Sequence, residues 1–537
     1  MSQDRRPIGH LAERSLAALV LLWIACRTAR LLRSTWAFTT DDAYITLRYA
    51  RHLAEGHGIV WNVGDHPSVE GYSNFLFVLL GAGAKLLELD PMLVLKGASC
   101  AALMATIVFL YLLARRWLTP LGATLAPAAL TAFKGTIFWS VSGLETSVYQ
   151  LWVVGATFFM CKGLDAHGRA ARAPFRLCAL ACLLAALTRP EGPVVALALG
   201  ATAFATYALA AAREERGSEA RARIYGEARQ SVVIFLALFV FPYAVYFVWR
   251  VAHFGRLLPN TVYCKAAYRG DRWILLREFW DQGRFFILLA CAQRPRRLGP
   301  RALSLFLIPV AYAVMLTGAD PIIGYYSRHF LAAFALLVVA ASIGAANLAS
   351  FASNIIVRLV RVRARLPEAA TIEWLPNVTQ AVLAGVFLVT SGTLDTEIGD
   401  PLAQEAARYS RRMAARKELG GYLDASLSPS QRYVIGDAGI VPYVSRPAVT
   451  DAFCLNSREL TSPEIHFDET RFIDWIYRSA PDALVVHSLS SVRLTPRGEY
   501  GFFPALVRDA RFGQYRLDRV FGARGDDFSY WVYRRNP

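Results

Sequence analysis

Long apolar runs recur along the chain and alternate with short polar segments. Most of these runs reach or approach the roughly 17–25 residues that cross a bilayer as a helix. The pattern predicts an α-helical membrane protein with many spans. The runs lie near 15–33, 74–90, 97–116, 121–140, 143–161, 175–189, 191–212, 231–250, 281–293, 301–317, 328–350 and 376–392.

The pattern changes after residue 393, where charged residues and turn signals interrupt the apolar ones. A charged, alanine-rich stretch from Asp400 to Ala425 predicts a helix that starts at Pro401. We therefore expect two domains, a membrane module at 1–392 and a small soluble α/β domain at 393–537. Runs separated by turns predict the strands of the second domain: Arg432 to Ile435, Ala483 to His487 and Tyr530 to Tyr533.

Composition supports the membrane assignment. Hydrophobic residues make up 55% of the 537 residues and charged residues only 18%, whereas soluble domains carry about 25% charged residues. A net charge of +17 would suggest a nucleic-acid partner for a soluble protein. Here the arginines concentrate in short loops between apolar runs, which is typical of cytoplasmic loops and excludes nucleic acid as the expected partner. The four basic loops are Lys162–Arg176, Arg213–Arg229, Arg294–Arg301 and Arg358–Arg365.

Placing these four loops in the cytoplasm fixes the topology from residue 143 onward. The polar N-terminus precedes a first helix that we expect to be retained, and a cytoplasmic N-terminus puts the first loop, 34–73, outside. A cytoplasmic N-terminus and an outer C-terminal domain require an odd number of crossings, whereas all of the runs together would give an even number. We therefore expect about 11 transmembrane helices. Either 74–90 is interfacial or re-entrant, or 97–140 crosses once. The Arg115–Arg116 pair favours the first option.

The cysteines indicate neither a zinc site nor a disulfide framework. Eight are present, most of them in or beside apolar runs, and none forms a CxxC motif or a cluster with histidine. Cys264 and Cys454 lie in outer segments. They could face an oxidising compartment, or both could be free thiols.

Two adjacent acids, Asp41 and Asp42, follow the first apolar run. Acids beside a membrane segment are rare unless they are paired or functional. Two neighbouring carboxylates also repel each other, which raises the pKa of one and suits a general base or a cation ligand. The alternative is structural, with one of the two acids capping a helix that begins near Ala43.

Other unusual polar residues fall on the same outer side in the expected topology. Each has an ordinary explanation alone, such as helix capping, turn formation or interfacial anchoring. Together they describe a cavity with carboxylates that can take a proton, cations that can neutralise a phosphate and aromatic rings that can stack on a sugar. The candidate substrate-binding residues are Tyr72, Glu145, Arg189, Glu191, Arg256, Asn260, Lys265, Arg328 and His329, with Asp320 as a weaker candidate.

This combination of motifs resembles the integral-membrane GT-C glycosyltransferases that use polyprenyl-phosphate sugars. Within them it is most similar to the terminal arabinofuranosyltransferases of mycobacterial cell walls and their relatives. A cysteine at 454 and the sequence around Asp320 depart from the family pattern. The resemblance is carried by Asp41–Ile45, Arg48–Ala50, Gly56–Gly58, Trp61–Asn62, Val69–Phe75, Ser142–Thr146, Arg189–Gly192, Leu258–Thr261, Gly436–Tyr443 and Asp451.

The resemblance implies a GT-C fold in a bacterial inner membrane, with the active site and the C-terminal domain facing the periplasm. It implies that Asp41 and Asp42 are the catalytic carboxylates, with Asp41 the first candidate. The donor would be polyprenyl-phosphate-linked arabinofuranose or another pentose, and the acceptor an envelope glycan or glycoprotein. No cofactor and no obligatory metal are expected, although the acid pair could bind a divalent cation.

Two other classes compete with this interpretation. A transporter or flippase of lipid-linked glycans would show inverted repeats and charges near the bilayer midplane, and the sequence shows neither. A membrane scaffold with a partner-binding tail would leave the acid pair and the outer cations unexplained.

Overall fold

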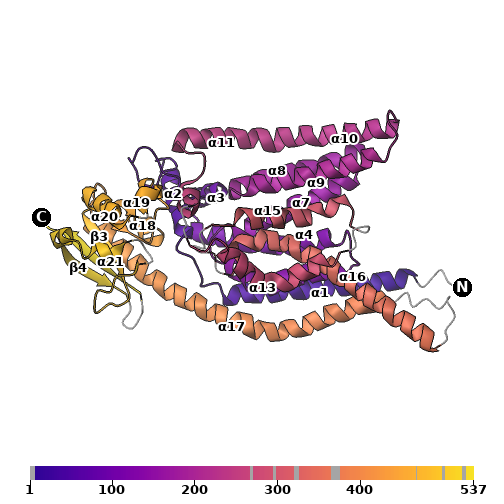
Figure 1. Ribbon diagram of the computed structural model, residues 1–537. Coiled ribbons are helices and arrows are strands. Elements are labelled where there is room, and N and C mark those ends of the chain that lie inside the picture. Colours follow the sequence, from indigo (N-terminus) through magenta and orange to yellow (C-terminus); the bar gives the residue numbers. More distant parts are fainter. Residues whose placement is uncertain are drawn as a thin grey trace.

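The apolar runs form long helices that lie side by side, with the C-terminal domain against one end of the bundle (Figure 1). The computed structural model describes residues 6–266, 270–293, 298–319, 324, 326–364, 375–466, 468–498, 502–522 and 528–537. Its larger helices before residue 430 are α1 (Arg6–Ser34), α2 (Ala43–Ala54), α3 (Phe75–Leu86), α4 (Pro91–Ala114), α5 (Leu125–Ala132), α6 (Lys134–Ser140), α7 (Thr146–Asp165), α8 (Arg172–Thr188), α9 (Gly192–Ala212), α10 (Glu219–Phe235), α11 (Phe241–Phe254), α12 (Asn260–Ala266), α13 (Ile274–Cys291), α15 (Ser304–Met315), α16 (Leu331–Ala364) and α17 (Leu375–Ser426).

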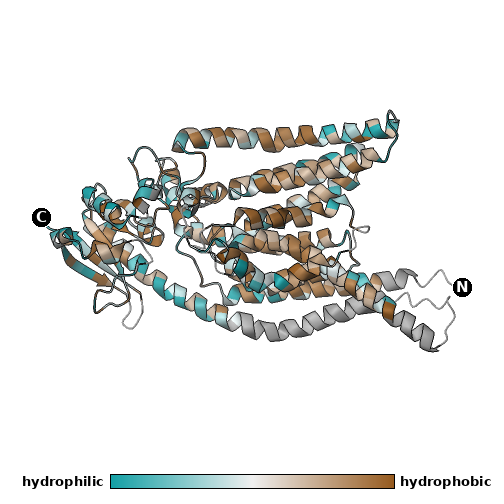
Figure 2. Ribbon diagram, in the orientation of Figure 1, coloured by the Kyte–Doolittle hydropathy of each residue, from teal (hydrophilic) through white to brown (hydrophobic). Residues whose placement is uncertain are grey.

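Six helical stretches of the described residues are long and apolar enough to cross a membrane. Figure 2 shows that apolar residues dominate the middle of these helices, while polar residues gather at the helix ends and in the C-terminal domain. The prediction of a polytopic helical membrane protein is therefore confirmed. The six stretches are Leu11–Ser34, Pro91–Ala114, Gly168–Thr188, Gly192–Ala212, Glu219–Phe254 and Arg328–Ile355.

Three elements differ from their sequence-based expectation. The run at 121–140 is not one helix but a short 3₁₀ turn followed by α5 and α6. The helix in the run at 74–90 is only α3, whose 12 residues span about 18 Å and cannot cross a hydrocarbon core of about 30 Å. The helix expected to start at Pro401 is part of α17, which has 52 residues in all and contains that proline in its interior. This helix also crosses the expected domain boundary at 393.

The two ends of the bundle differ in character. Figure 1 shows the start of α1 and the connection between α9 and α10 at the end remote from the C-terminal domain. That connection belongs to the basic loop Arg213–Arg229. The candidate acids and the C-terminal domain therefore share one end, here called the outer end, and this basic loop lies at the other.

The C-terminal domain contains a five-stranded sheet in the order β2-β1-β3-β5-β4. The first three strands in this order are parallel, β5 pairs antiparallel with β3, and β4 pairs antiparallel with β5 at the edge. The three predicted strands are present. The four-residue β2 and the mostly exposed β4 were not expected, because neither has the long apolar pattern of a buried strand. The strands are β1 (Arg432–Ile435), β2 (Ala448–Asp451), β3 (Ala483–Ser488), β4 (Tyr515–Phe521) and β5 (Ser529–Arg535), with α18 (Ile440–Val444), α19 (Pro463–His466), α20 (Glu469–Arg478) and α21 (Phe503–Leu506).

The first outer loop is bound to the C-terminal domain by buried polar groups. Arg48 on α2 donates to the backbone oxygens of Trp61, at 2.8 Å, and of Pro442. The Asn62 side chain accepts from Val449 N at 2.9 Å and donates to Val449 O at 3.0 Å. Asn62 thus pairs with the edge of β2 as a neighbouring strand would, and the loop and the domain form one unit.

A second junction joins the segment between α11 and α13 to the same domain. The Asn260 amide donates to Cys454 O at 2.8 Å and to Leu455 O at 3.0 Å. Arg256 donates to Asn260 Oδ1 and to Thr461 Oγ1, both at 2.7 Å. A disulfide joins Cys264 to Cys454, whose Cα atoms are 5.9 Å apart. The two cysteines are therefore not free thiols, and the sequence analysis did not predict that they pair with each other.

This disulfide gives the first testable prediction. Because it closes a sequence separation of 190 residues, Cys264→Ser/Cys454→Ser should lower the free energy of unfolding by about 2–4 kcal/mol. The measurement is the thermal unfolding midpoint of the purified protein. The exposed free thiol Cys291 provides the control, because Cys291→Ser should leave the midpoint unchanged. Labelling of all eight cysteines in the unreduced, denatured wild type would contradict the disulfide.

Candidate active site

Asp41 and Asp42 lie where the first loop meets the turn before α7. Thr40 N donates to Ser142 O at 3.0 Å, which fixes the backbone just ahead of the acids. Asp42 is the residue before α2, yet its side chain makes no capping hydrogen bond there. Asp41 Oδ1 instead accepts from Ile440 N at 3.1 Å, the first residue of α18. Asp41 therefore caps a helix of the C-terminal domain and Asp42 caps none.

Asp41 faces the C-terminal domain. Its Oδ1 lies 3.8 Å from Arg416 Nε, and the guanidinium of Arg416 also binds Asp437 at 2.8 Å. Burial raises the pKa of Asp41 to about 6, although the charge of Arg416 lowers it. Gly439 touches the acid so closely that an added Cβ would lie 2.2 Å from Asp41 Cγ. Asp41 is thus enclosed by the domain junction.

Asp42 faces a different set of charges. Burial raises its pKa to about 6, and the positive charges of Arg328 and Lys265 oppose this rise. Near neutral pH this carboxyl group is therefore mostly ionised but remains basic enough to accept a proton. Of the two acids, Asp42 is therefore the one that interacts with the charged cluster around Glu145, which includes Arg328.

Glu145, immediately before α7, is the centre of that cluster. Its Oε1 accepts from Arg189 NH1 at 2.7 Å and from Arg328 NH2 at 3.2 Å, while Oε2 accepts from Asn74 Nδ2 at 2.9 Å. Arg189 also binds both carboxylate oxygens of Glu191, at 3.1 and 2.7 Å. Burial alone would raise the pKa of Glu145, but Arg328 and Arg189 outweigh it and lower that pKa.

A pocket of about 360 Å³ opens beside this cluster. Lys265 projects from α12 toward it, and the ammonium group has no hydrogen bond or ion pair with any residue in the described ranges. Burial lowers the pKa of Lys265 to about 8, and the charges of Arg328 and Arg189 add to this effect. The lining is Ser73, Arg189, Pro190, Glu191, Thr261, Val262, Lys265, Met315, Leu316, Thr317, Gly318, Ala319 and His329.

The nine candidate binding residues thus fall into two groups. Six of them gather at the pocket or its cluster: Glu145, Arg189, Glu191, Lys265, Arg328 and His329. Arg256 and Asn260 have polar atoms engaged in the second domain junction. Tyr72 packs against the rings of Tyr49 at 4.9 Å and Phe254 at 6.1 Å. A substrate contact by any of the nine residues stays a prediction.

Some residues of the site carry roles that the sequence did not reveal. Asn74 accepts from Thr46 Oγ1 at 2.9 Å and donates to Glu145, so it orients the central carboxylate. Trp139 lies under the guanidinium of Arg328, whose Cζ is 4.9 Å from the ring centre. Arg416 holds Asp41. Asn74 lies within a motif of the resemblance, whereas nothing in the sequence distinguishes Arg416 from its neighbouring arginines.

The role of Asp320 and the expected independence from a metal or cofactor both remain untested. Asp320 lies outside the described residues. Within the described ranges, no group of three or more His, Cys, Asp or Glu side chains could hold a metal ion. Independence of the reaction from a divalent cation or another cofactor stays a prediction.

The fold of nearly the whole chain is similar to that of several solved structures. The chain resembles ArnT from Cupriavidus metallidurans bound to undecaprenyl phosphate, with 15% identity, a TM-score of 0.55 and 97% of each chain covered. It also resembles the archaeal oligosaccharyltransferase AglB from Archaeoglobus fulgidus in complex with an inhibitory peptide and a dolichol-phosphate. That match has 13% identity, a TM-score of 0.52 and coverage of 90% of this chain and 70% of AglB.

A third structure is the arabinofuranosyltransferase AftD from Mycobacteria, with 14% identity and a TM-score of 0.52. It is matched by 95% of this chain, which spans only 41% of the AftD chain. These likenesses define the class of fold: the chain has the GT-C glycosyltransferase fold, and the fold that the motif resemblance implied is confirmed. A domain of unknown function, DUF8728, matches residues 403–533. No curated protein matches the sequence.

The close approach of Gly439 to Asp41 yields a second prediction. Gly439→Ala should lower the free energy of unfolding by about 1–3 kcal/mol, because the new Cβ overlaps the Asp41 carboxyl group. Gly421→Ala in α17 is the matched control. There an added Cβ meets nothing within 4 Å, and alanine favours the helix. Thermal unfolding in detergent measures both, and equal midpoints for the two variants would contradict the contact.

Proposed function

We propose that this protein is a membrane glycosyltransferase that transfers a sugar from a polyprenyl-phosphate donor to an acceptor hydroxyl at the outer end of the bundle. One observation carries the proposal. A partly buried, basic carboxylate, Asp42, interacts electrostatically with Arg328 and Lys265, and Lys265 lines a pocket. Such a pairing of base and cations is what transfer from a sugar phosphate requires.

In the proposed reaction, the acceptor oxygen attacks the anomeric carbon of the donor sugar. The bond from that carbon to the phosphate oxygen breaks, and its electrons leave with the polyprenyl phosphate. The acceptor's proton moves to an oxygen of Asp42. This assignment ranks Asp42 ahead of Asp41, because Asp41 is occupied by Ile440 N and faces Arg416.

The cations have unequal parts in this reaction. Arg189 and Arg328 already contact Glu145, and Arg189 also contacts Glu191, so these two guanidinium groups form a rigid, largely neutralised frame. Lys265 interacts with Asp42 and Glu191 electrostatically, but its ammonium group has no hydrogen bond or ion pair within the described ranges. We assign Lys265 to the leaving phosphate, because a partly desolvated ammonium without a bonded carboxylate gains most from a bound anion.

The proposed location is a bacterial inner membrane with the outer end in the periplasm. Two observations support it. The basic loop Arg213–Arg229 lies at the opposite end of the bundle, as expected for a cytoplasmic loop. The disulfide between Cys264 and Cys454 lies at the outer end, and disulfides persist in oxidising compartments.

The finer part of the proposal concerns the substrates. We assign the donor as polyprenyl-phosphoryl arabinofuranose or another pentose, and the acceptor as an envelope glycan or glycoprotein. The motifs of the first loop and the fold of AftD support the pentose. The undecaprenyl phosphate bound to ArnT and the dolichol-phosphate in the AglB complex support the lipid carrier. A flippase is less well supported, because the charged cluster lies at helix ends rather than at mid-bundle.

The test is sugar transfer by the purified protein in liposomes. The protein receives polyprenyl-phosphoryl arabinofuranose and a short arabinan acceptor. Asp42→Asn should lower the rate by about 10²–10⁴-fold, because it removes the base. Asp41→Asn should lower it less and should mainly lower the unfolding midpoint. Inactive wild type with every lipid-linked sugar, or unchanged activity of Asp42→Asn, would overturn the proposal. Turnover with a hexose donor alone would correct only the sugar.

The acid and the lysine together predict a bell-shaped pH profile. The rate constant kcat/KM should fall below about pH 6, as Asp42 becomes protonated, and above about pH 8, as Lys265 loses its charge. Lys265→Arg provides the matched control, since arginine keeps its charge and should remove the alkaline limb. An acid limb that is unchanged in Asp42→Asn would assign that limb to another group.

A further inference from the structure

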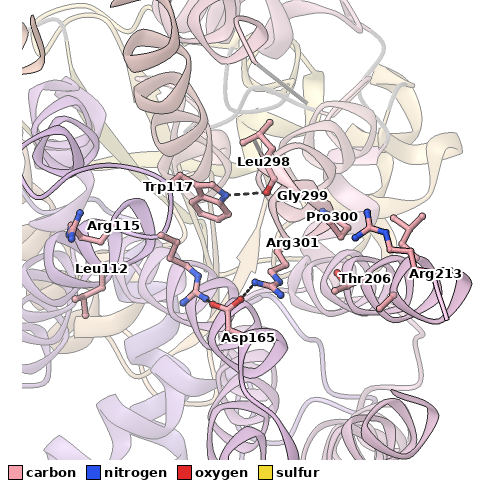
Figure 3. A pocket seen from close by; sticks show the side chains of 13 residues that line it. Leu112, Arg115, Trp117, Asp165, Thr206, Arg213, Leu298, Gly299, Pro300 and Arg301 are labelled. Atoms are coloured by element: carbon pink, nitrogen blue, oxygen red, sulfur yellow. Dashed lines mark hydrogen bonds and ion pairs between the residues drawn. The ribbon is translucent and has the colours of Figure 1, made fainter. Parts of the chain in front are cut away.

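A second cavity lies at the end of the bundle remote from Asp42. It has a volume of about 720 Å³ and lies between the ends of α4, α7, α9 and the short 3₁₀ turn Pro300–Leu303 (Figure 3). Both α7 and α9 begin beside the candidate active site, at Glu145 and Glu191, and end at this cavity. The 20 residues of α7 span about 30 Å, which is the thickness of a hydrocarbon core.

The lining of this cavity has an excess of positive charge. Four arginines and one carboxylate face it: Arg115, Arg116, Arg213, Arg301 and Asp165. Asp165 forms ion pairs with both Arg116 and Arg301, and Figure 3 shows the pair with Arg301. Arg213 has no hydrogen bond or ion pair with any residue that the structure describes. Asp165 thus contacts two of the four arginines but neutralises only one charge. Arg115 donates to Leu118 O, and an excess of positive charge remains to attract an anion.

Arginines at helix ends are often no more than solvated cytoplasmic charges, and this protein contains such a group for comparison. A second basic hollow, of about 400 Å³, is lined by Arg172, Arg176 and Arg229. All three are exposed. In the larger cavity Arg213 and Arg301 are also exposed, but the Arg116 side chain is only 17% exposed, and burial together with Arg301 lowers its pKa. A bound anion would relieve this unfavourable burial of like charges.

The apolar part of the wall indicates what carries the anion. Leu112 on α4 is 39% exposed and Leu209 on α9 is 50% exposed. Both lie in or beside spans that meet the bilayer, so they present apolar surface next to the arginines. Guanidinium groups bind phosphate oxygens in a bidentate manner, and basic pockets between spans hold anionic headgroups. We propose that this cavity binds the phosphate headgroup of an anionic phospholipid from the leaflet opposite the candidate active site.

The test uses the full chain in detergent and counts bound lipid by native mass spectrometry during titration with phosphatidylglycerol. Arg213→Gln should weaken binding about tenfold, because one charge-assisted contact is lost. Arg216→Gln is the matched control. It removes the same charge from the same loop, but residue 216 does not line the cavity. The unfolding midpoint without lipid should be equal in both variants, so that a loss of binding is not a loss of fold.

Two further arms define the ligand. Phosphatidylcholine with the same acyl chains should bind at least tenfold more weakly than phosphatidylglycerol, and inorganic phosphate should not displace the lipid. Equal weakening by Arg213→Gln and Arg216→Gln would overturn the site, since it would show a general charge effect. Full displacement by inorganic phosphate would overturn its assignment to a lipid. Neither outcome bears on sugar transfer at the other end.

Discussion

A carboxylate that leaves water must find cations or hydrogen-bond donors, and this constraint shapes the outer end of the protein. Glu145 is buried among Arg189, Arg328 and Asn74. Glu70 is buried against Arg250 at 3.0 Å. Asp437 is buried against Arg416. Each pair joins segments that are distant in the sequence. The same contacts that satisfy the acids therefore also assemble the site.

This arrangement separates two acids that the sequence presents as equivalent. Asp41 and Asp42 are neighbours, yet their carboxyl groups serve different partners. Asp41 stabilises the position of the C-terminal domain through Ile440 N and Arg416. Asp42 instead interacts electrostatically with Arg328 and Lys265. A site built in this way couples the placement of the soluble domain to the geometry beside the base.

Much of the fold could be predicted from the sequence because its signals are local. Apolar length predicts the spans, and six of the nine candidate residues gather at one cluster because they sit at helix ends on one side. The prediction was wrong where one apolar run contains two helices and where one helix extends beyond the segment that predicted it. α5 and α6 are separate helices within a single apolar run, and Pro401 does not start a helix because α17 continues through it.

The remaining parts of the site depend on contacts that no local pattern contains. The disulfide partners are 190 residues apart. Asn74 matters because it bridges Thr46 and Glu145 from two other helices. Arg416 is one of many arginines in α17, and only the fold shows that it is the one that reaches Asp41. Sequence alone cannot distinguish these residues from neighbours of the same type.

The continuity of α17 has a mechanical consequence. This helix of 52 residues is about 78 Å long, and Figure 1 shows it running along the bundle to the C-terminal domain. Each residue of a helix turns the chain by about 100° and advances it by about 1.5 Å. Adding one residue upstream of Arg416 would rotate that side chain away from Asp41, whereas adding seven would nearly restore its angle but displace it by about 10 Å. The number of residues in α17 therefore sets both the phase and the distance at which the soluble domain meets the membrane module.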